Sequence, residues 1–257
     1  MIKKTVLLTS GILFAISLNN AQGGWQDMLS GAANELMKNK ETTQTATSLL
    51  SNNEMVGGLK EALASGVESA IKTLGKKDGF MANSLVKIPL PASLKLIEKT
   101  AREHGQGQYV DQFISTMNHA AEAAVPDASE LLGEAIRQMS VEDAEKIING
   151  PDDAATQYFR KATSSKLAAK FKPVIEESTS KIGVISAYKS LVSQAAPALG
   201  NSMLTNFIPT DTLDVDQYVT DKTLDGLFKY IALEEKSIRE NPAARTTDLL
   251  KKVFSGQ

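Results

Sequence analysis

Residues 54–74 read EMVGGLKEALASGVESAIKTL, and this stretch sets the class of fold that we expect. Its apolar residues recur every three or four positions, which places them on one face of an α-helix. They are Val56, Leu59, Leu63, Val67, Ala70, Ile71 and Leu74. Gly75 follows, and a glycine directly after an apolar helical stripe is typical of a helix end. The stretch therefore predicts an amphipathic helix that must pack against other elements.

The same three-and-four spacing continues along the chain and predicts further helices. We expect them over residues 92–103, 109–124, 127–139, 140–149, 152–169, 185–196, 216–240 and 246–254. The last of these is capped by Thr246 or Thr247, and Ser140 with Asp143 resembles a capping box. Pro173 is expected to kink or restart the helix that precedes it.

One internal segment does not fit a helix. Residues 86–91 read VKIPLP, and a residue before proline is pushed towards extended backbone. Residues 86–91 are therefore predicted to be extended and not helical. The alternating pattern of a β-strand never persists beyond a few residues. The expected fold class is all-α, with a single compact multi-helix domain.

The N-terminal residues have the pattern of a secretory signal peptide. Lys3 and Lys4 are followed by an uncharged, mostly apolar run over 5–18, and Ala21 offers a small residue for cleavage. That run is too short to span a bilayer stably. We expect a signal peptide over 1–21, a flexible or weakly helical leader over 22–52 with a linker at 42–53, and the helical domain over 53–257. The predicted location is periplasmic or secreted.

The composition restricts the chemistry. A formal charge of −2 spread over a mixed surface argues against nucleic-acid binding, which needs a concentrated basic face. The chain has no cysteine, which removes disulfides, thiolate catalysis and zinc–thiolate sites. Only His104 and His119 are present, which weakens a Ser-His-Asp interpretation. We expect no metal, no cofactor, no assigned catalytic residue and no transmembrane segment in the mature chain.

The first polar candidates lie in the stretch MNHAAE. Asn118 and Glu122 are four residues apart and are flanked by alanines, so the helix that carries them should pack closely against its neighbours. Burial of an unpaired carboxylate is expensive, so Glu122 must have a partner. We expect it either to pair with a cation inside the fold or to lie at the rim of a pocket.

Further candidates for ligand binding lie towards the C-terminus. They are Tyr158, Arg160, Glu234, Glu235, Arg239 and Arg245. The spacing of Glu235 and Arg239 is that of ordinary helix support, and salt bridging between helices is the favoured interpretation. Alternatively, Arg239 and Arg245 form a fork that grips a carboxylate or a phosphate group.

The stretch from Ser190 to Thr210 carries no charge. It is too polar to cross a membrane, so a core-facing hairpin is the simplest interpretation. Alternatively, it covers an apolar cavity or touches lipid.

Several segments together resemble the bacterial family known as domain of unknown function 4197. The matching segments are 58–63 (GLKEAL), 76–80 (KKDGF), 86–91 (VKIPLP), 117–122 (MNHAAE), 153–160 (DAATQYFR), 218–228 (YVTDKTLDGLF) and 242–254 (PAARTTDLLKKVF). The resemblance implies a secreted or envelope-associated helical domain and carries no activity or catalytic residues.

The sequence leaves three functions open. The favoured hypothesis is a non-enzymatic binding or envelope-structural protein with an apolar or lipid-like ligand. The second is a hydrolase or lyase that uses convergent carboxylates and arginines. The third is a scaffold for another envelope protein through an exposed apolar patch.

Overall fold

A computed structural model describes residues 46–182, 186–187, 189–193 and 214–240. The chain divides after Ala46 into two compact units, and the described residues from Thr47 onward belong to the second. These residues form helices and their connections and include no strand. The helices are α2 (Ala46–Leu74), η1 (Ala92–Leu94), α3 (Lys95–Glu103), α4 (Gly107–Ala124), η2 (Val125–Asp127), α5 (Ala128–Gln138), α6 (Val141–Ile148), α7 (Ala154–Ile182) and α10 (Val215–Glu240). The all-α prediction is confirmed for this part of the chain.

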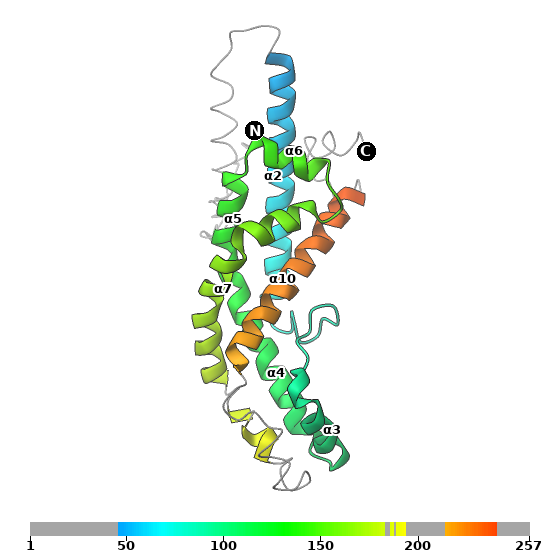
Figure 1. The fold of residues 1–257 in the computed structure, drawn as a ribbon, viewed down its shortest axis with the longest axis vertical. Helices are drawn as coiled ribbons and strands as arrows, with labels where there is room; N and C mark the ends of the chain where they lie inside the picture. Colours follow the sequence, from blue (N-terminus) through cyan, green and yellow to red (C-terminus); the bar gives the residue numbers. More distant parts are fainter. Residues whose placement is uncertain (1–45, 183–185, 188, 194–213, 241–257) are drawn as a thin grey trace, which may run out of the picture. The chain divides into compact units, whose positions relative to one another are not determined.

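Helix α2 buries the stripe that the sequence predicts. Leu59, Val67 and Leu74 are fully buried, and the Cβ of a residue at Gly66 would contact Ile238 and Glu234 of α10. Figure 1 shows α10 crossing beside α2. The linker expected over 42–53 is wrong for residues 46–53, which belong to α2. An amphipathic helix that has already nucleated extends through polar residues at small cost, because each added residue gains a hydrogen bond.

Helix α4 packs against α3, α7 and α10. Phe113 and Met117 are fully buried, as are the three alanines Ala120, Ala121 and Ala124. Small side chains let neighbouring helix backbones approach closely, which explains the alanine-rich end of this helix. The close packing expected around MNHAAE is confirmed.

Helix α7 differs from its prediction. It runs unbroken from Ala154 to Ile182 with Pro173 inside it, so the expected restart at this proline is wrong. Apart from Thr156, its buried residues recur every four positions: Ala155, Phe159, Thr163, Leu167, Phe171, Ile175 and Thr179. Four residues exceed one turn by about 40°, so the buried face winds around the helix. This winding lets one helix pack against α4, α5, α6 and α10, and its ribbon curves visibly in Figure 1.

The ends of the helices follow the sequence signals. Ser140 and Asp143 form the predicted capping box at the start of α6. Gly105 has φ +74° just after α3, and the Gln106 N–H donates to the carbonyl of Ala101 at 2.7 Å. This is the left-handed helix end that favours glycine. The GQG sequence at 105–107 therefore ends one helix and begins the next.

Residues 75–91, here called the strap, connect α2 to η1 without helix. Val86, Ile88 and Leu90 are buried, while Lys87 and Pro89 between them are exposed. The predicted extended segment is confirmed. Phe80 packs against α10 at Gly226, where an added Cβ would lie 2.7 Å from the Phe80 ring. Only glycine at 226 leaves room for this contact.

Several expectations lie outside the described residues. They are the signal peptide over 1–21, the leader up to residue 45, most of the uncharged stretch 190–210, Arg245 and the helix over 246–254. The described part of the predicted helix 185–196 is helical.

Candidate functional site

Asn118 binds the backbone of the strap. The Ile88 N–H donates to Asn118 Oδ1 at 2.8 Å, and Asn118 Nδ2 donates to the Ile88 carbonyl at 2.9 Å. The same Nδ2 also donates to the Ile114 carbonyl one turn earlier in α4. The fully buried amide thus makes the pair of bonds that a neighbouring β-strand would make. Its observed role is to hold the strap on α4.

Glu122, one turn further along α4, binds the turn at the start of the strap. Its carboxylate accepts the backbone N–H groups of Asp78 at 3.1 Å, Phe80 at 3.0 Å and Met81 at 3.0 Å. The side chain is buried. Backbone amides, instead of the expected cation, are the partners of this carboxylate among the described residues, and a place at a pocket rim stays a prediction. Hydrogen bonds to an ionised group are stronger than neutral ones, which offsets the cost of desolvation.

The turn that Glu122 binds needs its sequence KKDGF. Asp78 has φ +63°, a left-handed conformation that aspartate tolerates. A Cβ at Gly79 would lie 2.4 Å from the Leu74 carbonyl oxygen, so only glycine fits there. The turn therefore depends on the Glu122 carboxylate to satisfy its N–H groups, and the carboxylate depends on the turn to present them.

Glu235 and Arg239 on α10 bind the corner between α6 and α7, residues 147–156. Glu235 accepts the N–H groups of Ala155 and Thr156 at 2.9 Å each, and the Thr156 hydroxyl at 2.8 Å. Arg239 Nη2 donates to the Ile147 carbonyl at 2.8 Å. Glu235 therefore satisfies free amides at the N-terminus of α7. Arg239 satisfies a carbonyl at the C-terminus of α6.

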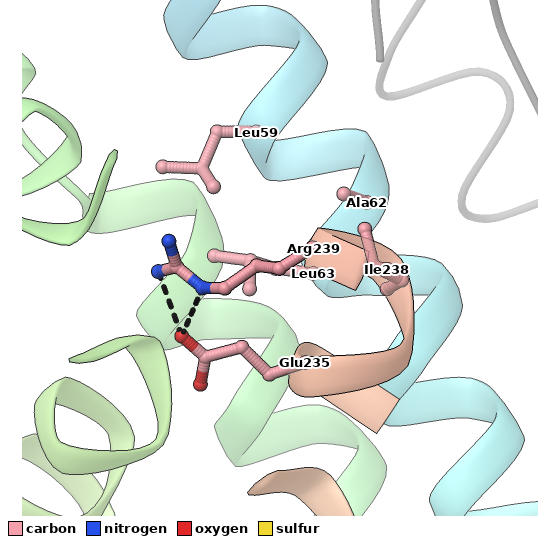
Figure 2. Close-up of a pocket in the computed structure, with 6 residues that line it drawn as sticks. All are labelled: Leu59, Ala62, Leu63, Glu235, Ile238 and Arg239. Carbon is pink, nitrogen blue, oxygen red and sulfur yellow. Dashed lines mark hydrogen bonds and ion pairs between the residues drawn. The ribbon is translucent and has the colours of Figure 1, made fainter. Parts of the chain in front are cut away.

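These two side chains also pair with each other. Arg239 Nη2 lies 3.0 Å from Glu235 Oε1, and the arginine and glutamate side chains are only 7% and 4% exposed. Figure 2 shows the pair on the last turns of α10, with dashed lines from the Arg239 guanidinium to one oxygen of Glu235. The expected salt bridge exists, but it lies within one helix; the contacts to other helices go to their backbone. A pair this deeply buried is tolerable because further hydrogen bonds satisfy both partners.

A hollow lies beside this ion pair. It is lined by Leu59, Ala62, Leu63, Glu235, Ile238 and Arg239 (Figure 2). Its volume is about 210 Å³, including the side that is open to solvent. The enclosed space has room for about one water molecule, far less than a drug-sized ligand needs.

The other candidate side chains lie apart. The Tyr158 hydroxyl donates to the Ala135 carbonyl at 3.1 Å, and burial raises the pKa of Tyr158. Arg160 lies over the Phe228 ring at 4.7 Å and 3.6 Å from Asp225 at the surface. Glu234 accepts the Ser69 hydroxyl of α2 at 3.0 Å. Of the candidates that the structure describes, Glu235 and Arg239 are the two that form a close charged pair with each other, and Glu234 is their neighbour on α10.

Sequence reasoning missed three side chains that bind distant backbone. Tyr218 donates to the Pro89 carbonyl at 3.0 Å, and Lys229 to the Leu85 carbonyl at 2.8 Å, so α10 also holds the strap. Lys60 of α2 donates to the Arg137 carbonyl at the end of α5, and burial lowers the pKa of this lysine. Their spacing in the sequence carries no signal, because each partner belongs to another element.

Two features are missing from the described ranges: a cluster of metal-binding side chains and a membrane-spanning helix. No group of three or more histidine and acidic side chains there is arranged to hold a metal ion. No described helix combines the length and apolar character that crossing a membrane requires.

The fold and the site together define an all-helical domain whose buried polar side chains anchor its own backbone. The chain belongs to the family described as Protein of unknown function (DUF4197), which matches residues 49–255. The family expected from the sequence motifs is confirmed, and its description assigns no activity. No curated protein and no solved structure matches the chain.

Proposed function

We propose that this chain is an exported, non-enzymatic helical protein that serves as a binding or structural component of the bacterial envelope. One observation carries the proposal: both buried carboxylates among the candidates are occupied by backbone amides. A carboxylate whose oxygens already accept backbone N–H groups is engaged in holding the fold, which favours a structural role for it. The same bonds hold the strap and the α6–α7 corner in one fixed arrangement.

Export rests on the pattern of the first residues. Two lysines, an apolar run and a small residue follow in the order of a cleaved secretory signal. The test is fractionation of the host combined with N-terminal sequencing of the purified protein. We expect a mature chain that begins near Gln22, outside the cytoplasm. A charge placed in the apolar run, as in Leu8→Arg, should retain the precursor inside the cell. An uncut chain in the cytosol would overturn this part of the proposal.

The non-enzymatic role is tested by variants that keep the fold. Glu122→Gln and Glu235→Gln preserve size and remove the charge. In a host that lacks the chain, we expect each variant to restore the envelope phenotype in proportion to the amount of folded protein. Complete loss of function at normal folded levels in either variant would favour the hydrolase or lyase hypothesis instead.

The ligand class that we propose is apolar or lipid-like, with the uncharged stretch 190–210 as one wall. The hollow beside Glu235 is too small to hold a lipid, so a lipid site would have to involve other residues. Native mass spectrometry of protein purified from its host, followed by extraction, should detect bound lipid that Leu199→Asp abolishes. If the native protein has only its unliganded mass, the ligand hypothesis is wrong and the structural role remains.

A further inference from the structure

Charge is unevenly distributed around the junction of α6 and α7. Residues 140–153 carry five acids and one lysine, a net charge of −4, and residues 154–175 carry five bases and no acid, a net charge of +5. The whole chain has a formal charge of only −2, so this contrast disappears in the average. Neighbouring regions of opposite charge create local fields that attract a complementary partner.

Three lysines of α7, here called the basic face, are turned towards solvent. Lys161 and Lys166 are exposed, and Lys172 is half-buried. Among the described residues none of the three forms an ion pair, whereas Lys170 is paired with Glu130 at 2.6 Å. The exposed residues between them have small side chains: Ala162, Ser165 and Ala169. The three amino groups are therefore accessible to an anionic partner.

Three acids before α7, here called the acidic patch, are also at the surface. Glu142, Glu145 and Asp152 are all exposed. Glu142 pairs with Lys146 of its own helix at 2.7 Å, but the lysine and glutamate side chains remain 68% and 76% exposed. An ion pair this exposed is weak, so Glu142 can exchange its partner at low cost.

The two regions do not cancel each other within one copy. Asp152 lies just before α7, and the helix rises about 18 Å from its start to Lys166 and about 27 Å to Lys172. Surface charges are largely screened beyond about 10 Å at 0.1 M salt. Only the start of the basic face lies near an acid of α6: the pKa of Asp143 is lowered mainly by hydrogen bonds from its cap and also by the charge of Lys161.

We propose that a second copy of the chain docks antiparallel on this surface, with the acidic patch of each copy against the basic face of the other. A contact related by a two-fold axis is reciprocal, so every acid–base pair forms twice. Because each exposed pair is weak, several must act together, and the dimer should be reversible and sensitive to salt. The inference concerns self-association and does not depend on the proposed function.

Analytical ultracentrifugation of the natural chain is the first test, and it needs no substitution. We expect a monomer–dimer equilibrium whose Kd rises at least about tenfold when NaCl is raised from about 0.05 M to about 0.5 M. A chain that stays monomeric at low salt, or a dimer that salt does not weaken, would overturn the proposal.

Charge reversal identifies the surface. One variant combines Lys161→Glu, Lys166→Glu and Lys172→Glu, and the other combines Glu142→Lys, Glu145→Lys and Asp152→Lys. Each variant alone should be monomeric, because like charges then meet, and an equimolar mixture of the two should form a heterodimer. If the mixture stays monomeric although both variants keep the circular dichroism of the natural chain, the proposal is wrong.

The matched control reverses three exposed lysines of the strap and α3, Lys87→Glu, Lys95→Glu and Lys99→Glu, with the same change of net charge. Its Kd should stay within about twofold of the natural value, because the acidic patch and the basic face are untouched. An equal loss of the dimer in this control would show that net charge and not this surface governs association. Binding of the natural chain to phosphatidylglycerol vesicles without self-association would assign the basic face to lipid and also overturn the proposal.

Discussion

The α4 pair Asn118–Glu122 and the α10 pair Glu235–Arg239 are built alike and work differently. In each pair two polar side chains four residues apart bind the backbone of a distant segment. The α4 pair holds an extended strap with an amide and a carboxylate. The α10 pair holds two helix ends with opposite charges. Identical spacing on a helix therefore does not reveal what the side chains bind.

The difference lies in how each buried charge is compensated. Glu122 relies on three N–H dipoles of one turn. Glu235 has two backbone amides at the N-terminus of α7, a hydroxyl and the guanidinium of Arg239. Removing Glu235 therefore takes a charged partner from the buried Arg239, whereas removing Glu122 affects only neutral donors. This contrast predicts a ranking of mutational effects.

The largest effect is expected for Glu235→Ala. It removes the carboxylate bonded to Arg239, whose side chain is 7% exposed, and frees the amides of α7. Loss of one partner of a buried ion pair costs about 3–5 kcal/mol. Urea unfolding should show this loss as a lower midpoint, with exposed Glu68→Ala as the control at less than about 0.5 kcal/mol. Adding Arg239→Met should recover part of the loss. If Glu235→Ala lowers the unfolding free energy by less than about 1 kcal/mol, charge compensation does not distinguish the α10 pair from the α4 pair.

Asn118→Ala should come second. It leaves the Ile88 N–H and carbonyl buried without their partner, at about 1–3 kcal/mol for each unsatisfied group. We expect a total of about 2–4 kcal/mol in unfolding free energy. Amide hydrogen exchange at Ile88 should accelerate more than exchange at Ala155 on the α6–α7 corner. Equal acceleration at both positions would show that the strap does not open independently of the α6–α7 corner.

Glu122→Gln should cost about 2 kcal/mol. The glutamine oxygen can still accept from Phe80 and Met81, but its NH₂ group then faces the N–H of Asp78. Glu122→Asp is the informative companion variant, because it keeps the charge and shortens the reach. If Glu122→Gln proves more costly than Glu235→Ala, charge compensation by the arginine is not what separates the two pairs.

The smallest effect is expected for the local cap of α6. Hydrogen bonds from the Ser140 hydroxyl and backbone N–H lower the pKa of Asp143. The stability from this cap is therefore present above the ordinary aspartate pKa of about 4 and is lost as the pH falls through the lowered value. Asp143→Asn should cost about 0.5–1 kcal/mol at pH 7 and less at pH 2, measured by thermal unfolding at both pH values. An undiminished cost at pH 2 would contradict the assignment.

The sequence predicted the elements well where their signals are local. The stripe of α2, the capping box at Ser140 and the helix end at Gly105 depend on neighbours within a few residues, so spacing alone reveals them. Of the kink or restart expected at Pro173, the restart is wrong, because packing against four other helices holds α7 continuous despite the missing hydrogen bond. The sequence also failed at residues 46–53, where the helix extends beyond its apolar stripe.

The candidate residues show the same division. Alanines around Asn118 and Glu122 correctly indicated burial, and the argument that Glu122 needs a partner was correct in principle. The identity of the partner was not predictable, because Glu122 binds residues 41–44 positions away and Glu235 binds residues 79 and 80 positions away.

By itself the sequence determined that the chain is helical, free of cysteine and a member of its family, because periodicity, composition and motifs are properties of neighbouring residues. Only the tertiary structure decided that the buried acids serve the backbone. A carboxylate has the same chemistry whether it meets a cation, a ligand or three amides, and the choice depends on which segment the packing brings within about 3 Å of its oxygens.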